Sequence, residues 1–101
     1  MDRVAAILKK LQNYEPQKVI LFGSFARGEV DEYSDLDLVV IKETPRRFVE
    51  RLIEVARIVG TGFGKVDIFA YTPEEFEKMK EIGNPFIEQV LKDGITIYEK
   101  K

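Results

Sequence analysis

The chain has 101 residues, of which 45% are hydrophobic, 11% aromatic and 34% charged, a composition typical of a globular domain. It contains no cysteine and no histidine, which excludes disulfides, thiolate or imidazole zinc sites and any catalytic pair that needs Cys or His. Carboxylates, hydroxyls, lysines and arginines remain for chemistry. The net charge of -2 argues against broad electrostatic binding to nucleic acid, which is a disfavoured partner without being excluded.

The length predicts one domain over residues 1–101, with a single core and no room for a second domain that would hold an acceptor. No apolar run approaches the roughly 20 residues that a membrane helix needs. Residues 1–3 lead directly into a helical pattern, with neither a signal segment nor a lipidation motif. We therefore expect a cytoplasmic protein without a membrane partner.

The first elements are a helix and a short strand. Apolar residues recur at helical spacing between residues 2 and 13, which predicts an amphipathic helix that packs on a sheet. Pro16 then breaks this pattern. Residues 19–22 form a short β-branched and aromatic run closed by Gly23, which is typical of a buried strand.

A turn at Gly23-Ser24 follows this strand. Gly23 allows the backbone to approach a ligand closely, and Ser24 can cap a short helix whose first N–H groups bind phosphate oxygens. Residues 25–33 contain a glycine and several polar residues, so we expect a short helix and a mobile loop there. Arg27 in this stretch is either an ordinary surface charge or an anchor for phosphate close to the turn.

An Asp-Leu-Asp pattern stands at the start of the next predicted strand, residues 36–41. Because side chains alternate across a strand, Asp35 and Asp37 project from one face while Leu36 and Leu38 project from the other. Two carboxylates side by side repel each other, and a divalent cation between them removes the repulsion. Mg2+ prefers carboxylate oxygens and completes its shell with water and substrate phosphate, so the pattern favours a site for a nucleoside triphosphate.

A second interpretation of this pattern needs no metal. Asp35 would then cap a turn and Asp37 would form a surface ion pair, because turns and edge strands favour aspartate for their own reasons. The preceding Gly23-Ser24 turn favours the metal interpretation.

The next predicted helix spans residues 44–59, with Thr44 as N-cap, Pro45 at the first position and a broad apolar stripe. Its arginines form a basic surface that is either simply solvated or a partner surface: Arg46, Arg47, Arg51 and Arg57. The glycines at positions 60, 62 and 64 indicate a flexible loop. A cofactor cradle is disfavoured because the strand-to-helix context of a dinucleotide fingerprint is missing.

Residues 66–71 form the next predicted strand, and Asp67 is a charged residue set between apolar neighbours. If this strand lies beside residues 36–41, Asp67 converges with Asp35 and Asp37 into a cluster of three carboxylates. The alternative is that Asp67 lies at the strand edge and is solvated.

The remaining elements are two helices and a last strand. Thr72-Pro73-Glu74-Glu75 is a capping box that predicts a helix start. A further apolar stripe begins after Pro85 and ends near Gly94, and residues 95–98 form a short strand. The order of elements predicts an α/β fold with helices packed on a mixed β-sheet.

Three short motifs occur together in the first half of the chain: Gly23-Ser24, Ala26-Arg27-Gly28 and Ser34-Asp35-Leu36-Asp37. This string resembles the signature of the minimal nucleotidyltransferases of the DNA polymerase beta superfamily, which are often antitoxin partners of HEPN-domain toxins. The resemblance covers nearly the whole chain. It implies a polymerase beta-like nucleotidyltransferase fold, two Mg2+ ions, a nucleotide donor and a third carboxylate on a later strand.

The resemblance also implies roles for single residues. Asp67 would supply the third carboxylate, help to hold the catalytic metal and assist loss of the acceptor hydroxyl's proton. The predicted site therefore has two parts, a metal-binding and catalytic set of Asp35, Asp37 and Asp67, and a nucleotide-binding set of Gly23, Ser24 and Arg27.

From these observations we expect a Mg2+-dependent nucleotidyltransferase that moves AMP from ATP onto a hydroxyl of a partner macromolecule and releases pyrophosphate. The expected partner is a HEPN-type toxin, which the protein would modify as an antitoxin, as a protein adenylyltransferase does. The alternative is a binding module that neutralises a toxin by contact alone. Nucleic-acid polymerisation by this domain alone is disfavoured by its size and acidity. The oligomeric state, homodimer or hetero-oligomer, stays open.

Overall fold

The computed structural model describes residues 3–23, 26 and 35–101. The elements in chain order are helix α1 (Arg3–Leu11), the 3-10 helix η1 (Gln12–Tyr14), strands β1 (Lys18–Phe22) and β2 (Leu36–Ile41), helix α2 (Phe48–Val59), strand β3 (Val66–Tyr71), helices α3 (Pro73–Glu81) and α4 (Pro85–Asp93), and strand β4 (Ile95–Glu99). None of the helices in the described ranges is long and apolar enough to span a membrane. The predicted elements are thus present, apart from the short helix expected within residues 25–33, most of which lies outside the described residues.

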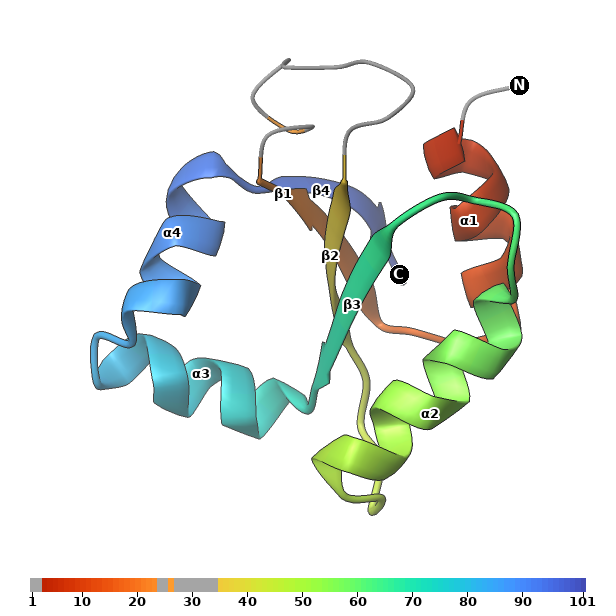
Figure 1. Cartoon of the computed structure of the whole chain (residues 1–101). Helices are drawn as coiled ribbons and strands as arrows, with labels where there is room; N and C mark the ends of the chain where they lie inside the picture. The colour runs from red at the N-terminus through yellow and green to blue at the C-terminus, as the bar shows by residue number, and fades with distance from the viewer. Residues whose placement is uncertain (1–2, 24–25, 27–34) are drawn as a thin grey trace.

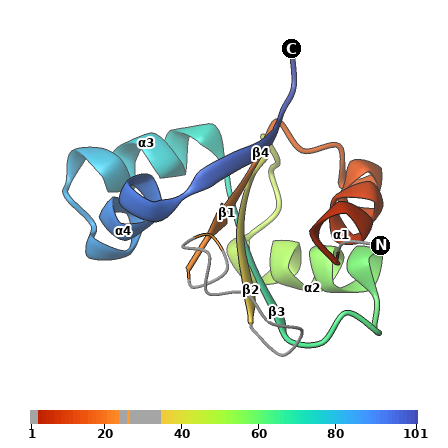
Figure 2. The same cartoon turned by 90° about the horizontal axis from the view of Figure 1, so that it is seen from above.

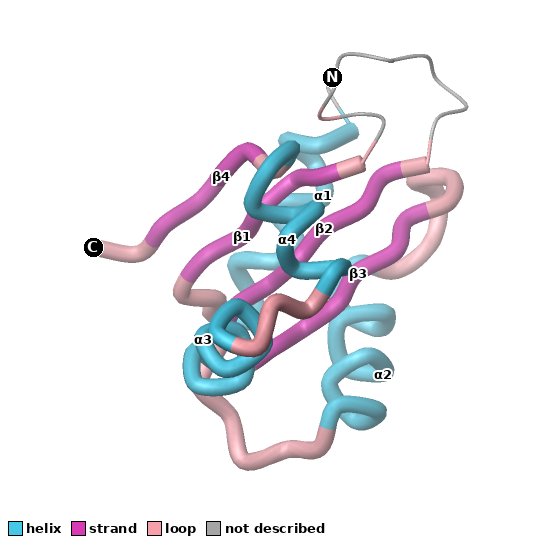
Figure 3. The backbone as a smooth tube through the Cα atoms, turned by 90° about the vertical axis from the view of Figure 1, so that its left-hand side faces the viewer, coloured by secondary structure: helices cyan, strands magenta, loops and turns pink. Residues whose placement is uncertain are grey.

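The four strands form one mixed sheet in the order β3-β2-β1-β4 (Figure 3). Strand β1 runs antiparallel to both of its neighbours, β2 and β4. Strands β2 and β3 are parallel and joined through α2, as a crossover connection requires. The sheet confirms the predicted mixed topology and places residues 66–71 directly beside residues 36–41.

Helices cover both faces of this sheet, with α1 and α2 on one side and α3 and α4 on the other (Figures 1 and 2). The two central strands, β1 and β2, are buried on both faces and are nearly continuous apolar runs, whereas the edge strands β3 and β4 are more exposed. Alternate residues of β2 divide between the two cores: Leu36, Leu38 and Val40 face α1 and α2, whereas Val39 and Ile41 face α3 and α4.

Both helices on the second face begin where the sequence predicts. The Thr72 hydroxyl accepts a hydrogen bond from the Glu75 backbone N–H at 3.1 Å, and the Glu75 carboxylate accepts one from the Thr72 N–H at 2.9 Å. The Asn84 side chain caps α4 in the same manner by accepting from the Phe86 N–H. These caps satisfy backbone donors that would otherwise lack a partner at the helix ends.

The predicted start of α2 is wrong by a few residues, because the helix begins at Phe48 and not at Thr44-Pro45. The Thr44 hydroxyl accepts from the Arg46 N–H at 3.2 Å, which is a local turn and not a helix cap. The Phe48 ring stacks on Tyr71 of β3 with centroids 5.4 Å apart. The Glu50 carboxylate also accepts from the Arg47 N–H at 2.9 Å, so a local cap and the packing of Phe48 together mark the start of the helix.

The interpretation of Arg51 as part of an exposed basic surface is also wrong. Its side chain is only 6% exposed and donates two hydrogen bonds to Glu75, at 2.6 and 3.1 Å. It also donates to the backbone carbonyls of Arg46 and Ala70. Arg51 thus ties α2 to the end of β3 and the start of α3, and the planar guanidinium suits this multiple contact.

The Arg51–Glu75 pair predicts a pH-dependent contribution to stability. Hydrogen bonding to Arg51 lowers the pKa of Glu75, with further help from the Thr72 backbone. A lowered folded-state pKa stabilises the protein above the unfolded value, about 4.3 for glutamate, and this stabilisation is lost as the pH falls through the folded-state pKa. Because the Glu75 side chain is 43% exposed and solvent weakens its interactions, Glu75→Gln should lower the free energy of unfolding by only about 0.5–1.5 kcal/mol at pH 7, and by clearly less at pH 3.

Urea denaturation of both proteins at the two pH values checks this expectation. The matched control is Glu77→Gln, because Glu77 forms an exposed ion pair with Lys80 at 3.7 Å and such pairs contribute little. An equal loss at both pH values would show that Glu75 acts through packing and not through its charge.

Candidate active site

Three of the predicted site residues lie at the same end of three neighbouring strands. The register places Asp37 of β2 opposite Phe22 of β1 on one side and opposite Asp67 of β3 on the other. Gly23 follows Phe22 directly. The end of β1 and the starts of β2 and β3 therefore bring Gly23, Asp37 and Asp67 together, although they are far apart in sequence.

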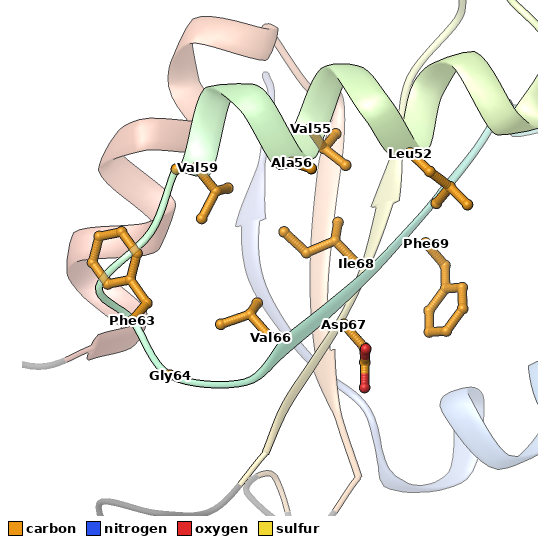
Figure 4. Close-up of a pocket in the computed structure, with 11 residues that line it drawn as sticks. Leu52, Val55, Ala56, Val59, Phe63, Gly64, Val66, Asp67, Ile68 and Phe69 are labelled. Atoms are coloured by element: carbon orange, nitrogen blue, oxygen red, sulfur yellow. The ribbon is translucent and has the colours of Figure 1, made fainter.

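The two carboxylates share the face of the sheet that α3 and α4 cover. Val66 and Ile68 point toward α2, while Asp67 between them points away from it (Figure 4). Asp37 lies on the same side, because its β2 neighbours Leu36 and Leu38 pack on the opposite face. A hollow of about 350 Å³ between α2 and β3 includes Asp67 in its wall, but the carboxylate is directed away from it.

An aromatic cluster occupies the face beside these acids. The rings of Phe22, Phe69 and Phe86 lie against one another, with centroid distances of 5.3 to 6.4 Å. Phe22 is the register partner of Asp37 and Phe69 is two residues after Asp67. Apolar rings therefore border the site on one side.

This environment raises the pKa of Asp37 above its ordinary value. Burial is the largest cause, followed by the negative charges of Asp67 and then Asp35, while Lys65 acts weakly in the opposite direction. Burial and like-charge repulsion thus make negative charge unfavourable in this site, and a bound cation would offset this effect. Carboxylates perturbed by burial and by like-charged neighbours are candidates for functional sites.

Asp35 lies just before β2, where its carboxylate forms an ion pair with the Lys65 ammonium at 3.4 Å. Within residues 3–23, 26 and 35–101, no three acidic side chains are grouped closely enough to hold a metal ion between them. The predicted cluster of Asp35, Asp37 and Asp67 is therefore not assembled as a closed ligand set. The donor chemistry still suits Mg2+, which typically takes one or two carboxylates and fills its other positions with water and phosphate.

Gly23 adopts a backbone conformation with φ of +81°, which favours glycine. A Cβ atom at this position would lie 3.3 Å from the Asp37 Cγ and closer still to its Oδ2. The glycine therefore makes room for the Asp37 carboxylate. This is a structural reason for Gly23 in addition to the predicted approach of phosphate, which stays a prediction.

The other two predicted nucleotide-binding residues, Ser24 and Arg27, lie outside the described residues, and their roles stay predictions. Lys65 is a site residue that the sequence interpretation missed. It stands two positions before Asp67 in the string Lys65-Val66-Asp67, and a cation next to a predicted catalytic acid was the signal that could have identified it.

Comparison with known proteins identifies the class. Residues 1–99 match the family model described as Nucleotidyltransferase domain. The chain therefore belongs to the nucleotidyltransferase domain family. This confirms the predicted family, fold and enzyme class.

The relatives come from Methanocaldococcus jannaschii. The chain is 37% identical over 82 residues to "Putative protein adenylyltransferase MJ0141", which covers 79% of this chain and 77% of that protein. A shorter match, 59% identical over 34 residues, covers 33% of this chain and only 23% of "Putative protein adenylyltransferase MJ1305". The fold resembles a chain in the crystal structure of a toxin-antitoxin with AMP-PNP, with a TM-score of 0.64, 19% identity, and coverage of 100% of this chain and 76% of that chain.

Asp37→Asn should stabilise the metal-free protein at neutral pH. A carboxyl whose folded-state pKa is raised favours folding below its unfolded value, about 3.9, and loses this contribution as the pH rises through the folded-state pKa. At pH 7 the ionised Asp37 is therefore unfavourable, and its neutral isostere should raise the melting temperature by roughly 1–4 °C. At pH 3 the gain should disappear.

Thermal unfolding in the presence of a chelator measures this difference, with the exposed Glu81→Gln as the control for loss of one negative charge. A lower melting temperature for Asp37→Asn at pH 7 would mean that its carboxylate is structural, and the description of the site as a place of charge repulsion would be wrong.

Gly23→Ala should destabilise the chain more than the same change at another glycine with positive φ. Gly62 has φ of +98° and nothing within 4 Å of an added Cβ, so Gly62→Ala reports backbone strain of roughly 1 kcal/mol alone. At Gly23 the clash with Asp37 adds to this strain. We expect Gly23→Ala to exceed the control by about 1–2 kcal/mol, and the second substitution Asp37→Ala to remove most of the excess.

Proposed function

We propose that this protein transfers a nucleoside monophosphate, AMP from ATP, onto a hydroxyl of a partner protein, and that residues 1–101 act as a single catalytic domain. The observation that carries the proposal is the in-register pair of Asp37 and Asp67 beside Gly23. In a chain of the nucleotidyltransferase domain family, this pair provides the concentrated negative charge that a metal-bound triphosphate needs.

Each described residue has a distinct role in this reaction. Gly23 leaves the space that Asp37 occupies and lets the backbone approach the triphosphate. Asp37 and Asp67 orient the donor, with Asp35 as the third acid of the site. The Asp67 carboxylate would accept the proton of the acceptor hydroxyl, because it carries negative charge at the edge strand where an acceptor can approach.

The bonds that change are defined by this chemistry. The acceptor oxygen forms a bond to the α-phosphorus of ATP while the bond between that phosphorus and the oxygen bridging to the β-phosphate breaks. Pyrophosphate leaves, and the acceptor proton passes to the carboxylate. Asp35, Asp37 and Asp67 would hold Mg2+, which when bound offsets the negative charge that develops on the attacking and leaving oxygens.

Two findings support a protein acceptor. The relatives with the longer matches are named as protein adenylyltransferases, and chains of the same fold occur in toxin-antitoxin crystal structures. The chain also has one small core on each face of its sheet and no separate acceptor-binding unit among the described residues. A docked protein can supply the positioning that the reaction requires. We therefore propose a HEPN-type toxin as partner, with the present protein as its antitoxin.

The test combines the protein with a HEPN-type partner, ATP and Mg2+, and measures the partner by intact mass spectrometry. We expect a gain of one or more adenylate units. Asp37→Asn and Asp67→Asn should each reduce the rate by at least about 100-fold, while the exposed control Glu81→Gln should not.

The outcomes separate the alternatives. A partner that stays unmodified but is inhibited on binding would favour the non-catalytic binding module. Label transferred to RNA and not to protein would keep the enzyme class and replace the acceptor. Full activity of Asp37→Asn would refute the proposed roles of the carboxylates.

A further inference from the structure

We propose that Lys65 is the resident counter-ion of the acid site, which occupies the place of the divalent cation when none is bound and thereby sets the affinity for that cation. The inference rests on the proposed function, since it assigns a competitor to the same metal site. It concerns a residue that none of the motifs identified in the sequence includes.

The ion pair with Asp35 is the first observation. The Lys65 ammonium lies 3.4 Å from the Asp35 Oδ2, and its charge also acts on Asp37, where it opposes the effect of the neighbouring acids. It is therefore a cation placed within the field of the site's carboxylates. A single positive charge leaves most of their repulsion in place, which is why a divalent cation can replace it.

The backbone of Lys65 is fixed, which makes this placement a property of the fold. Its carbonyl accepts a hydrogen bond from the Leu36 N–H at 3.1 Å and a longer one from the Arg3 guanidinium at 3.4 Å. Arg3 also donates to the Phe63 carbonyl at 2.8 Å. Helix α1 thus holds the glycine-containing loop so that it delivers Lys65 beside Asp35 at the start of β3.

The side chains of the pair are exposed, which makes the pair easy to exchange. Lys65 is 68% and Asp35 is 46% exposed, and ion pairs in such a position contribute little to stability. The Arg51 guanidinium, which is only 6% exposed and donates two hydrogen bonds to Glu75, would resist such replacement. The structure therefore combines a rigid backbone at Lys65 with a weakly held ammonium, as a displaceable counter-ion requires.

The experiment measures Mn2+ binding to the full chain without nucleotide, by titration calorimetry or by the relaxation of water protons. Lys65→Met should bind Mn2+ about 3- to 10-fold more tightly than the wild type, because the competing and repelling charge is gone. Lys78→Met is the matched control, since Lys78 is an exposed lysine of α3 away from the acids. Lys65→Arg should keep the wild-type affinity.

A second measurement uses the chelated protein and needs no metal. Lys65→Met should lower the melting temperature slightly relative to Lys78→Met, because the acids lose an exposed counter-ion. Adding Asp35→Asn to Lys65→Met should recover this loss, because the unpaired charge is then removed. A double variant less stable than Lys65→Met would overturn the inference.

The outcomes also distinguish this inference from the proposed function. Wild-type protein that binds Mn2+ with the same affinity as Lys65→Met, or more tightly, would overturn the role of Lys65 and leave the metal site in place. Absence of Mn2+ binding by every variant would refute both. Tighter binding by Lys65→Met and unchanged binding by Lys78→Met would support the counter-ion role.

Discussion

The site depends on one constraint, the parallel register that places Asp37 of β2 beside Asp67 of β3. Side chains opposite each other on adjacent strands are close neighbours, and like charges in such a pair are destabilising. Apolar contacts between the rest of the two strands hold the register. Leu38 and Val40 of β2 lie opposite Ile68 and Ala70 of β3. The core thereby keeps two carboxylates together against their repulsion.

The features around the acids follow from this arrangement. Gly23 lacks a Cβ where the Asp37 carboxylate needs the space. The aromatic rings of Phe22, Phe69 and Phe86 border one side of the site. Burial in such surroundings makes negative charge on Asp37 less favourable. Negative charge concentrated in this way attracts positive charge, and the fold brings it together within a small domain.

Sequence reasoning could predict what depends on local pattern. The strand period separates Asp37 from its apolar neighbours, and the capping box at Thr72 and Glu75 marks a helix start, so these features agree with the structure. The strand pattern also identified Asp67, to which the resemblance to a known family added the role of third acid, and its strand lies beside β2. The metal and nucleotide roles of these residues are predictions that the fold alone does not test.

What sequence reasoning missed depends on contacts between distant elements. Arg51 looks like one member of a row of solvated arginines, and only the packing of α2 against β3 and α3 shows that it is buried. The start of α2 at Phe48 likewise depends in part on its stacking on Tyr71. The pairing of Lys65 could not be predicted because its partner, Asp35, is 30 positions away in the sequence.

Strand β3 combines these two kinds of electrostatics at its opposite ends. At its start, Asp67 lies beside the like-charged Asp37 and raises the pKa of that residue in the predicted metal site. At its end, the Ala70 carbonyl accepts from Arg51, whose buried guanidinium pairs with the partly exposed Glu75 carboxylate. The hydrogen bonds of Arg51 fix the far end of the strand, while the apolar contacts between β2 and β3 hold the carboxylates in register. Stability and chemistry are thus separated along a single strand of six residues.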